Sequence, residues 1–256
     1  MNSSSRRLRA VSWAVVLCCA LGLLAATPVL ATSTILRTEL LTLSSVLTGN
    51  PLRDATVAEA PQLPAEVVTG LRLDPVWIQH TAQATDISER ALSAYTAAAL
   101  TIQHEYPNCN IGWNTLAAIG YVETRHGTIY GSHLNDDGVA VPAITGPALD
   151  GEQFKGIPDS DNGELDGDTT WDRAVGPMQF IPQTWAIYGR DGNGDGIADP
   201  QHIDDAALSA AALLCARGGD LTKQASWIRA VHAYNQSIEY NHRVVDAANF
   251  YARAAG

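Results

Sequence analysis

The stretch AIGYVETRHG, residues 118–127, is an apolar helical segment that ends by presenting one carboxyl group, that of Glu123. Just before it, Leu116, Ile119 and Gly120 recur at helical spacing, and Glu123 continues the same face. The pattern predicts a helix from about residue 114 to 125, with Gly127 as its left-handed cap. Burial on that face and a place in the last helical turn would both raise the pKa of the carboxyl.

Two later segments add to this acid. GPMQFIP spans residues 176–182, and AYN spans residues 233–235. Gly176 removes a side chain where a sugar could approach the backbone. Gln179 can donate and accept through one amide, as an N-acetyl group requires. An acid, a glycine turn with a glutamine and a Tyr-Asn pair are what cleavage of an amino-sugar polymer needs.

A purely structural interpretation stays open for each segment. Glu123 would then lie at the surface and pair with Arg125 or His126. Gly176 would form an ordinary turn, with Gln179 at the surface. Tyr234 would then be a core residue, and Asn235 would cap the end of its helix.

Together the three segments resemble the signature segments of lytic murein transglycosylases, in the membrane-bound type B branch as actinobacteria carry it. The similarity covers about residues 74–256. It implies a mainly α, goose-lysozyme-like domain that cleaves peptidoglycan between N-acetylmuramic acid and N-acetylglucosamine. By this resemblance Glu123 is the sole catalytic acid and base, and the product is an anhydro sugar.

The resemblance also implies roles for other residues. Gln179 would hold substrate near the acid, while Tyr234 and Asn235 would orient the acetamido group and brace the carboxyl. Thr170, nine residues before the glutamine, falls where a Ser or Thr bonds the acid. The substrate-binding set expected in this way is Gln179, Tyr234, Asn235, Tyr240, Thr170, Gly176 and Met178.

The segment DGNGDGI, residues 191–197, alternates Asp, Asn and Asp with glycine at the sixth position, as an EF-hand calcium loop does. Its twelfth position is His202, which is no ligand for a hard cation. Type B transglycosylases have a longer loop, closed by an acid fourteen residues after the first. The resemblance therefore implies a structural Ca²⁺ bound by Asp191, Asn193, Asp195, the Ile197 carbonyl and Asp205, with no cofactor for catalysis. The alternative is an Asp-Gly turn in which Asp204 or Asp205 caps the next helix.

Composition and charge frame these expectations. The chain has 256 residues, of which 46% are hydrophobic and 17% charged, which suits one globular domain with extra segments. Residues 6–9 (RRLR) followed by an apolar run over 11–30 indicate a signal peptide cleaved after Ala31, or a membrane anchor. Without residues 1–31 the net charge goes from −11 to −14, which argues against nucleic acid or anionic membrane surfaces as partners. The expected partner is the peptidoglycan glycan strand, in the cell envelope.

Cysteine usage agrees with export. Cys109 and Cys215 are the two cysteines beyond the apolar run, and an even pair in an exported protein is most simply a disulfide. The alternative is two separate buried thiols. Residues 32–73, interrupted by prolines, are interpreted as a linker or arm, and residues 74–256 as the catalytic domain.

The rest of the domain is expected to be helical apart from one long irregular part. Helical spacing and stop signals predict helices at 87–106, 182–188, 205–217, 222–234 and 237–255. Asp86 and Glu89 have the spacing of a capping box for the first of these helices. Residues 128–175 hold seven glycines and an acidic run, and we expect them to form a lid beside a cleft. The acidic run is interpreted as solvated rather than as a cation site.

Other functions remain as alternatives at this point. A lysozyme-like hydrolase would need a second group to position water, which Asp168 or Asp172 would supply. A non-catalytic glycan-binding protein and a secreted calcium-binding module are the other two.

Overall fold

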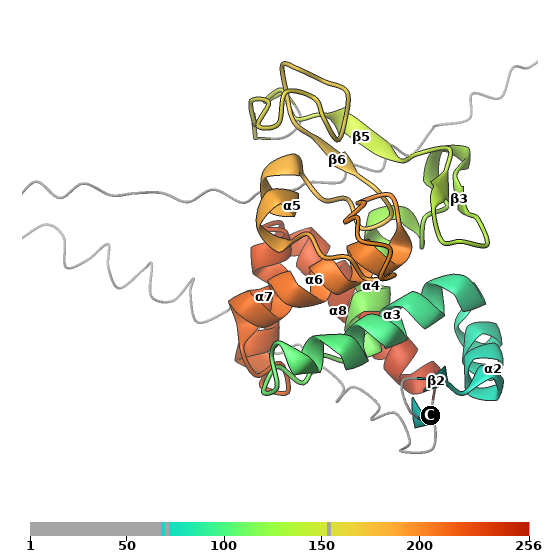
Figure 1. Cartoon of the computed structure of the whole chain (residues 1–256). Helices are drawn as coiled ribbons and strands as arrows, with labels where there is room; N and C mark the ends of the chain where they lie inside the picture. Colours follow the sequence, from blue (N-terminus) through green and yellow to red (C-terminus); the bar gives the residue numbers. More distant parts are fainter. Residues whose placement is uncertain (1–67, 70–71, 153–154, 256) are drawn as a thin grey trace, which may run out of the picture.

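The computed structural model describes residues 68–69, 72–152 and 155–255 (Figure 1). The expected signal segment 1–31 and most of the arm lie outside the described residues. At the end of the arm, β1 (Val68–Thr69) and β2 (Arg72–Leu73) form an antiparallel pair. Across the described ranges, none of the helices combines the length and apolar character needed to cross a bilayer.

The described chain is mainly helical, as predicted. The helices are α2 (Pro75–Thr85), α3 (Glu89–Thr101), α4 (Trp113–Thr124), α5 (Pro182–Tyr188), α6 (Ile203–Gly218), α7 (Gln224–Tyr234) and α8 (Ile238–Ala254), with short 3-10 turns η2 (Ile102–His104) and η3 (Ile129–Gly131). Two further antiparallel pairs join β3 (His133–Leu134) to β4 (Ala140–Val141) and β5 (Thr145–Ala148) to β6 (Arg173–Val175). Sequence periodicity did not predict these strands, because each is too short to show an alternating pattern.

Helix α4 lies at the centre of the helical body, in contact with α3 and α8, while α6 packs against α3 and α7 (Figure 1). Every residue of α4 except Tyr121 is buried. Small residues allow this close packing: a Cβ on Gly120 would lie 2.0 Å from the Tyr95 hydroxyl oxygen of α3. The helix that carries Glu123 is therefore fixed on several sides by packed neighbours.

Two helix ends differ from the sequence prediction. Helix α3 is capped by Ser88, whose Oγ accepts the Ala91 N–H at 3.2 Å, while Asp86 takes a left-handed conformation that ends α2. Helix α4 ends at Thr124, and Arg125 rather than Gly127 is its left-handed cap. The cap lies earlier than predicted because the Arg125 and His126 N–H groups turn back to bond the Tyr121 and Gly120 carbonyls, which ends the helix before Gly127.

The predicted disulfide between Cys109 and Cys215 is confirmed. It joins the segment just before α4 to α6, across a sequence separation of 106 residues. In the chain-entropy description, a loop of this length stabilises the fold by about 3 to 5 kcal/mol, because it restricts the unfolded chain.

Candidate active site

Glu123 is buried in the last turn of α4, with 2% of its surface exposed. Its Oε1 accepts a hydrogen bond from the Tyr240 hydroxyl at 2.7 Å, and its Oε2 has no hydrogen-bond partner in the described part of the chain. Burial raises the pKa of Glu123 to about 8, against the opposing effects of the Tyr240 hydrogen bond and the Arg243 charge. The carboxyl therefore keeps its proton at neutral pH, as a general acid must.

The end of α4 and helix α7 both hold the turn of residues 176–180, which we call the glutamine turn. Thr124 Oγ1 donates to the Pro177 carbonyl at 2.5 Å, and the Tyr234 hydroxyl donates to the Met178 carbonyl at 2.8 Å. Val175 and Phe180 close the turn through two backbone hydrogen bonds. The structure thus brings the three sequence segments together at one place in the fold.

Within the glutamine turn, the side chains of Gln179 and Met178 make contacts that stabilise the turn and its packing. Gln179 is buried, has a φ of 51°, and donates from Nε2 to the Gly176 carbonyl at 3.0 Å. The Met178 side chain is fully buried in the hydrophobic core. A Cβ on Gly176 would lie 1.7 Å from the Pro200 carbonyl oxygen, and its φ is +76°. The backbone of a neighbouring loop, rather than the expected room for a sugar, accounts for this glycine.

The residue that bonds the Glu123 carboxyl differs from the expectation, which gave this role to Tyr234 and Asn235. Tyr240, not Tyr234 or Asn235, bonds the Glu123 carboxyl. Asn235 is fully buried, and its Oδ1 accepts the Ser237 N–H at 2.9 Å, which links α7 to α8. Its Nδ2 has no hydrogen-bond partner among the described residues. Asn235 therefore performs the capping role considered above and also keeps an amide donor for another group.

Thr170 lies on the exposed surface of the acidic loop, residues 155–172, and the structure does not bring it to Glu123. Its N–H donates to Asp168 Oδ1 at 2.9 Å, and its carbonyl accepts the Asp159 N–H at 3.1 Å. Neither oxygen of Glu123 is bonded to Thr170. The expected contact is absent because the acidic loop folds on itself through carboxylate-to-backbone hydrogen bonds.

Two residues that the sequence did not single out contribute to the site. Thr124 ties the end of α4 to the glutamine turn, and Arg243 of α8 donates from Nη2 to the Val122 carbonyl at 3.4 Å. The signal for Arg243 was its spacing, since it follows Tyr240 by three residues and so shares its helical face.

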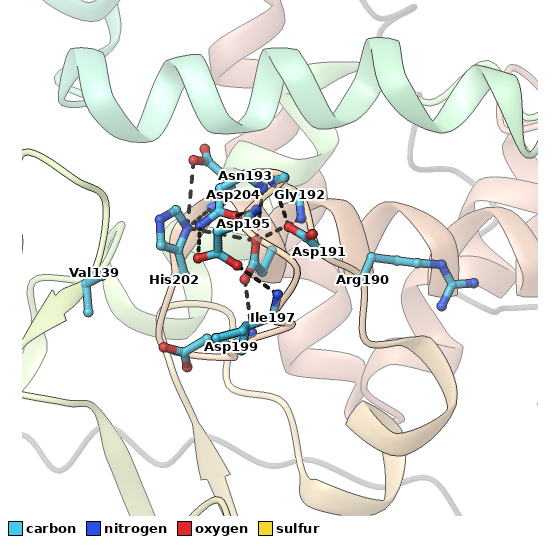
Figure 2. A network of polar contacts seen from close by, with 12 residues as sticks. Val139, Arg190, Asp191, Gly192, Asn193, Asp195, Ile197, Asp199, His202 and Asp204 are labelled. Carbon is cyan, nitrogen blue, oxygen red and sulfur yellow. Dashed lines mark hydrogen bonds and ion pairs between the residues drawn. The ribbon is translucent and has the colours of Figure 1, made fainter.

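The expected calcium loop, residues 191–205, is drawn in Figure 2. Asp191 accepts the N–H groups of Gly194 and Gly196 at 2.6 and 2.8 Å. Asp205 is fully buried, and its carboxylate accepts N–H groups from the loop, those of Gly192, Asn193 and Asp199. The loop is therefore wound around its own carboxylates.

The donor chemistry of this loop fits a hard cation, since carboxylate, amide and carbonyl oxygens are the ligands that Ca²⁺ prefers. Asp205 carries a pKa raised above its ordinary value by burial, an effect that a bound cation would oppose. The alternative in which Asp204 or Asp205 caps α6 is not what the structure shows. His202 is the N-cap, and Asp204 instead bonds Arg90.

A second group of acids lies in the acidic loop. Asp159, Asp161 and Asp172 each place one carboxylate oxygen within 4.8 Å of the others, an arrangement that can hold a metal ion. The sequence analysis interpreted the acidic run as solvated, and the structure adds that the carboxylates of these three residues lie close together. Asp172 also accepts the Ser160 N–H and Oγ–H, both at 2.8 Å.

The fold and the site define a mainly helical, lysozyme-like domain with small two-stranded sheets and a buried glutamate, Glu123, at the end of its central helix. Residues 77–250 match the Transglycosylase SLT domain, and the chain belongs to that family.

Two solved structures are similar to this chain. One is the Escherichia coli lytic transglycosylase Slt35 in complex with bulgecin A, with 16% identity, a TM-score of 0.43, and 85% of this chain and 84% of that chain covered. The other is SltB3 from Pseudomonas aeruginosa in complex with NAG-anhNAM-pentapeptide, with 19% identity, a TM-score of 0.30, and 70% of this chain and 52% of that chain covered. A search of curated proteins gives no match.

Proposed function

We propose that this protein is a peptidoglycan lytic transglycosylase of the membrane-bound type B branch, as actinobacteria carry it, and that it acts in the cell envelope. It cleaves the β-glycosidic bond between N-acetylmuramic acid and N-acetylglucosamine and leaves an anhydro-muramic end. One observation carries the proposal: the carboxyl of Glu123 is buried at the end of α4, and burial raises its pKa to about 8. Membership of the SLT family supplies the class of substrate.

In the proposed reaction Glu123 acts twice. Its proton goes to the leaving glycosidic oxygen as the C–O bond breaks, and the substrate's own acetamido carbonyl stabilises the developing cation. The Glu123 carboxylate then takes the proton of the sugar's primary hydroxyl, whose oxygen bonds the anomeric carbon. No water enters, and the carboxyl is protonated again at the end. The unpartnered Nδ2 of Asn235 is a suitable donor for the acetamido carbonyl.

The structure favours this reaction over hydrolysis, because the two acids considered as water-positioning groups are occupied. Asp172 bonds Ser160, and Asp168 forms an ion pair with Arg173 at 2.8 Å. Hydrolysis with inversion needs a second carboxylate across the sugar from the acid.

Digestion of purified peptidoglycan, followed by mass measurement of the released fragments, tests the proposal. The expected fragments carry a muramic end that is one water lighter than a hydrolysed reducing end. Hydrolysed ends would indicate a lysozyme-type reaction. An intact polymer would indicate a glycan-binding protein.

For the 191–205 loop we propose a structural Ca²⁺, held by Asp191, Asn193, Asp195, the Ile197 carbonyl and Asp205. Calcium is expected to raise the melting temperature relative to a sample with a chelator, because it binds the folded loop. The Asp191→Asn variant should lose this response, whereas Asp246→Asn, at an exposed position on α8, should keep it. Equal melting temperatures with calcium and with chelator would contradict the proposal.

A further inference from the structure

Helix α8 presents two polar side chains to the last turn of α4. The Tyr240 hydroxyl donates to Glu123 Oε1 at 2.7 Å. Arg243, three residues later and on the same helical face, donates from Nη2 to the carbonyl of Val122 at 3.4 Å. The Val122 carbonyl belongs to the peptide that joins Val122 to Glu123, so α8 places the guanidinium against the backbone that carries the acid, and its charge acts on the Glu123 carboxyl.

From this geometry we infer that Arg243 is a positioning residue for Glu123. The positive charge of the Arg243 guanidinium stabilises the carboxylate form of Glu123, which must exist for part of the reaction. The inference rests on the proposed function, in which one carboxyl must first give up a proton and then take one back. Burial alone favours only the protonated form. A cation held beside the carboxyl stabilises the anion that exists between the two proton transfers.

The charged and titratable groups around Glu123 support this assignment. The Arg243 charge lowers the pKa of Glu123, against the larger effect of burial. Tyr240, also from α8, lowers the pKa of Glu123 through its hydrogen bond. Tyr234 of α7 raises the pKa of Tyr240. His126, just past the end of α4, is bonded to Tyr95 of α3 and Tyr251 of α8. Among the described residues, Arg243 is the cation whose charge acts on the carboxyl.

The pH profile of peptidoglycan cleavage is the first test. Cleavage by the native protein is expected to decline as pH rises past the Glu123 pKa, because the acid loses its proton. In Arg243→Gln the decline should move to higher pH, by about one pH unit, since the carboxylate loses its cation. Arg243→Lys should restore the native position. Arg253→Gln removes the same charge from an exposed site on α8, ten residues away, and should leave the profile unchanged.

A purely structural role for Arg243 predicts a different result. Activity would then fall by the same factor at every pH, with no movement of the decline and no rescue by lysine. That outcome would overturn the inference. If Arg243→Gln does not fold, Arg243→Met removes the same charge and keeps most of the side-chain volume.

A second measurement separates this inference from the proposed function, because it does not use substrate. The free energy of unfolding is measured against pH for the native protein, Arg243→Gln, Glu123→Gln and the double variant. Arg243→Gln should extend the pH-dependent fall in stability to higher pH, and this effect should vanish in the Glu123→Gln background. If the effect of Arg243→Gln depends on Glu123 but the protein cleaves no glycan, the proposed function is wrong and the electrostatic role of Arg243 stands. No coupling would sink the assignment, whatever the protein does to peptidoglycan.

Discussion

The Glu123→Gln variant is expected to cleave peptidoglycan about a thousand times more slowly than the native protein, while still binding the glycan. Glutamine keeps the size of the side chain and can accept the Tyr240 hydrogen bond, but it has no proton to give to the leaving oxygen. Release of soluble fragments measures the rate, and cosedimentation with the polymer measures binding. Glu239→Gln is the matched control, because Glu239 is exposed and lies beside Tyr240 on α8. Unchanged cleavage by Glu123→Gln would remove the catalytic assignment.

The Glu123→Gln variant is expected to stay folded, so its loss of activity should be chemical. The free energy of unfolding, measured against pH, tests this. Burial raises the folded pKa of Glu123 from 4.5 to about 8. Between these values the folded chain holds a proton that the unfolded chain has released, so stability falls as pH rises through the window. The contribution of Glu123 is complete below pH 4.5 and lost above about pH 8. Glu123→Gln should remove this fall and be more stable than the native protein near neutral pH, by on the order of 2 kcal/mol.

Gly176→Ala is expected to destabilise the fold by about 3 kcal/mol or more. The new methyl group would lie 1.7 Å from the Pro200 carbonyl oxygen, and this neighbour is backbone that cannot rotate away. The φ of +76° adds a cost for any residue with a Cβ. Chemical denaturation of both proteins measures the difference.

The matched control for this substitution is Gly131→Ala. Gly131 has nearly the same φ, +79°, but a Cβ there meets no atom within 4 Å. Its cost, about 1 kcal/mol, reports the backbone conformation alone. Equal losses at the two positions would show that the Pro200 backbone moves aside at no cost, and would contradict the steric reason given for Gly176.

The helical part of the fold could be predicted from the sequence because its signals are local. Periodic apolar residues, prolines and caps predicted α5 with its observed bounds and α4 to within about one residue. The short strands gave no such signal. The cap of α4 was placed too late, since glycine is the usual left-handed residue and Arg125 takes that role here through backbone hydrogen bonds.

The site was predictable only in part, for a related reason. The burial of Glu123 followed from the apolar face of its own helix. The contacts of Tyr240 and Arg243 with α4 depend on how α8 packs, which no local pattern records. The Thr170 expectation came from spacing alone and ignored how strongly the surrounding aspartates bond their own backbone.

The disulfide spans a stretch of chain that includes Glu123, the glutamine turn and the 191–205 loop, whereas Tyr240 lies beyond it. A protease that cuts once within the acidic loop would therefore leave two polypeptides still tied by the Cys109–Cys215 bond. The acid and its tyrosine partner would stay in one nicked molecule, and only a reductant would let the pieces part.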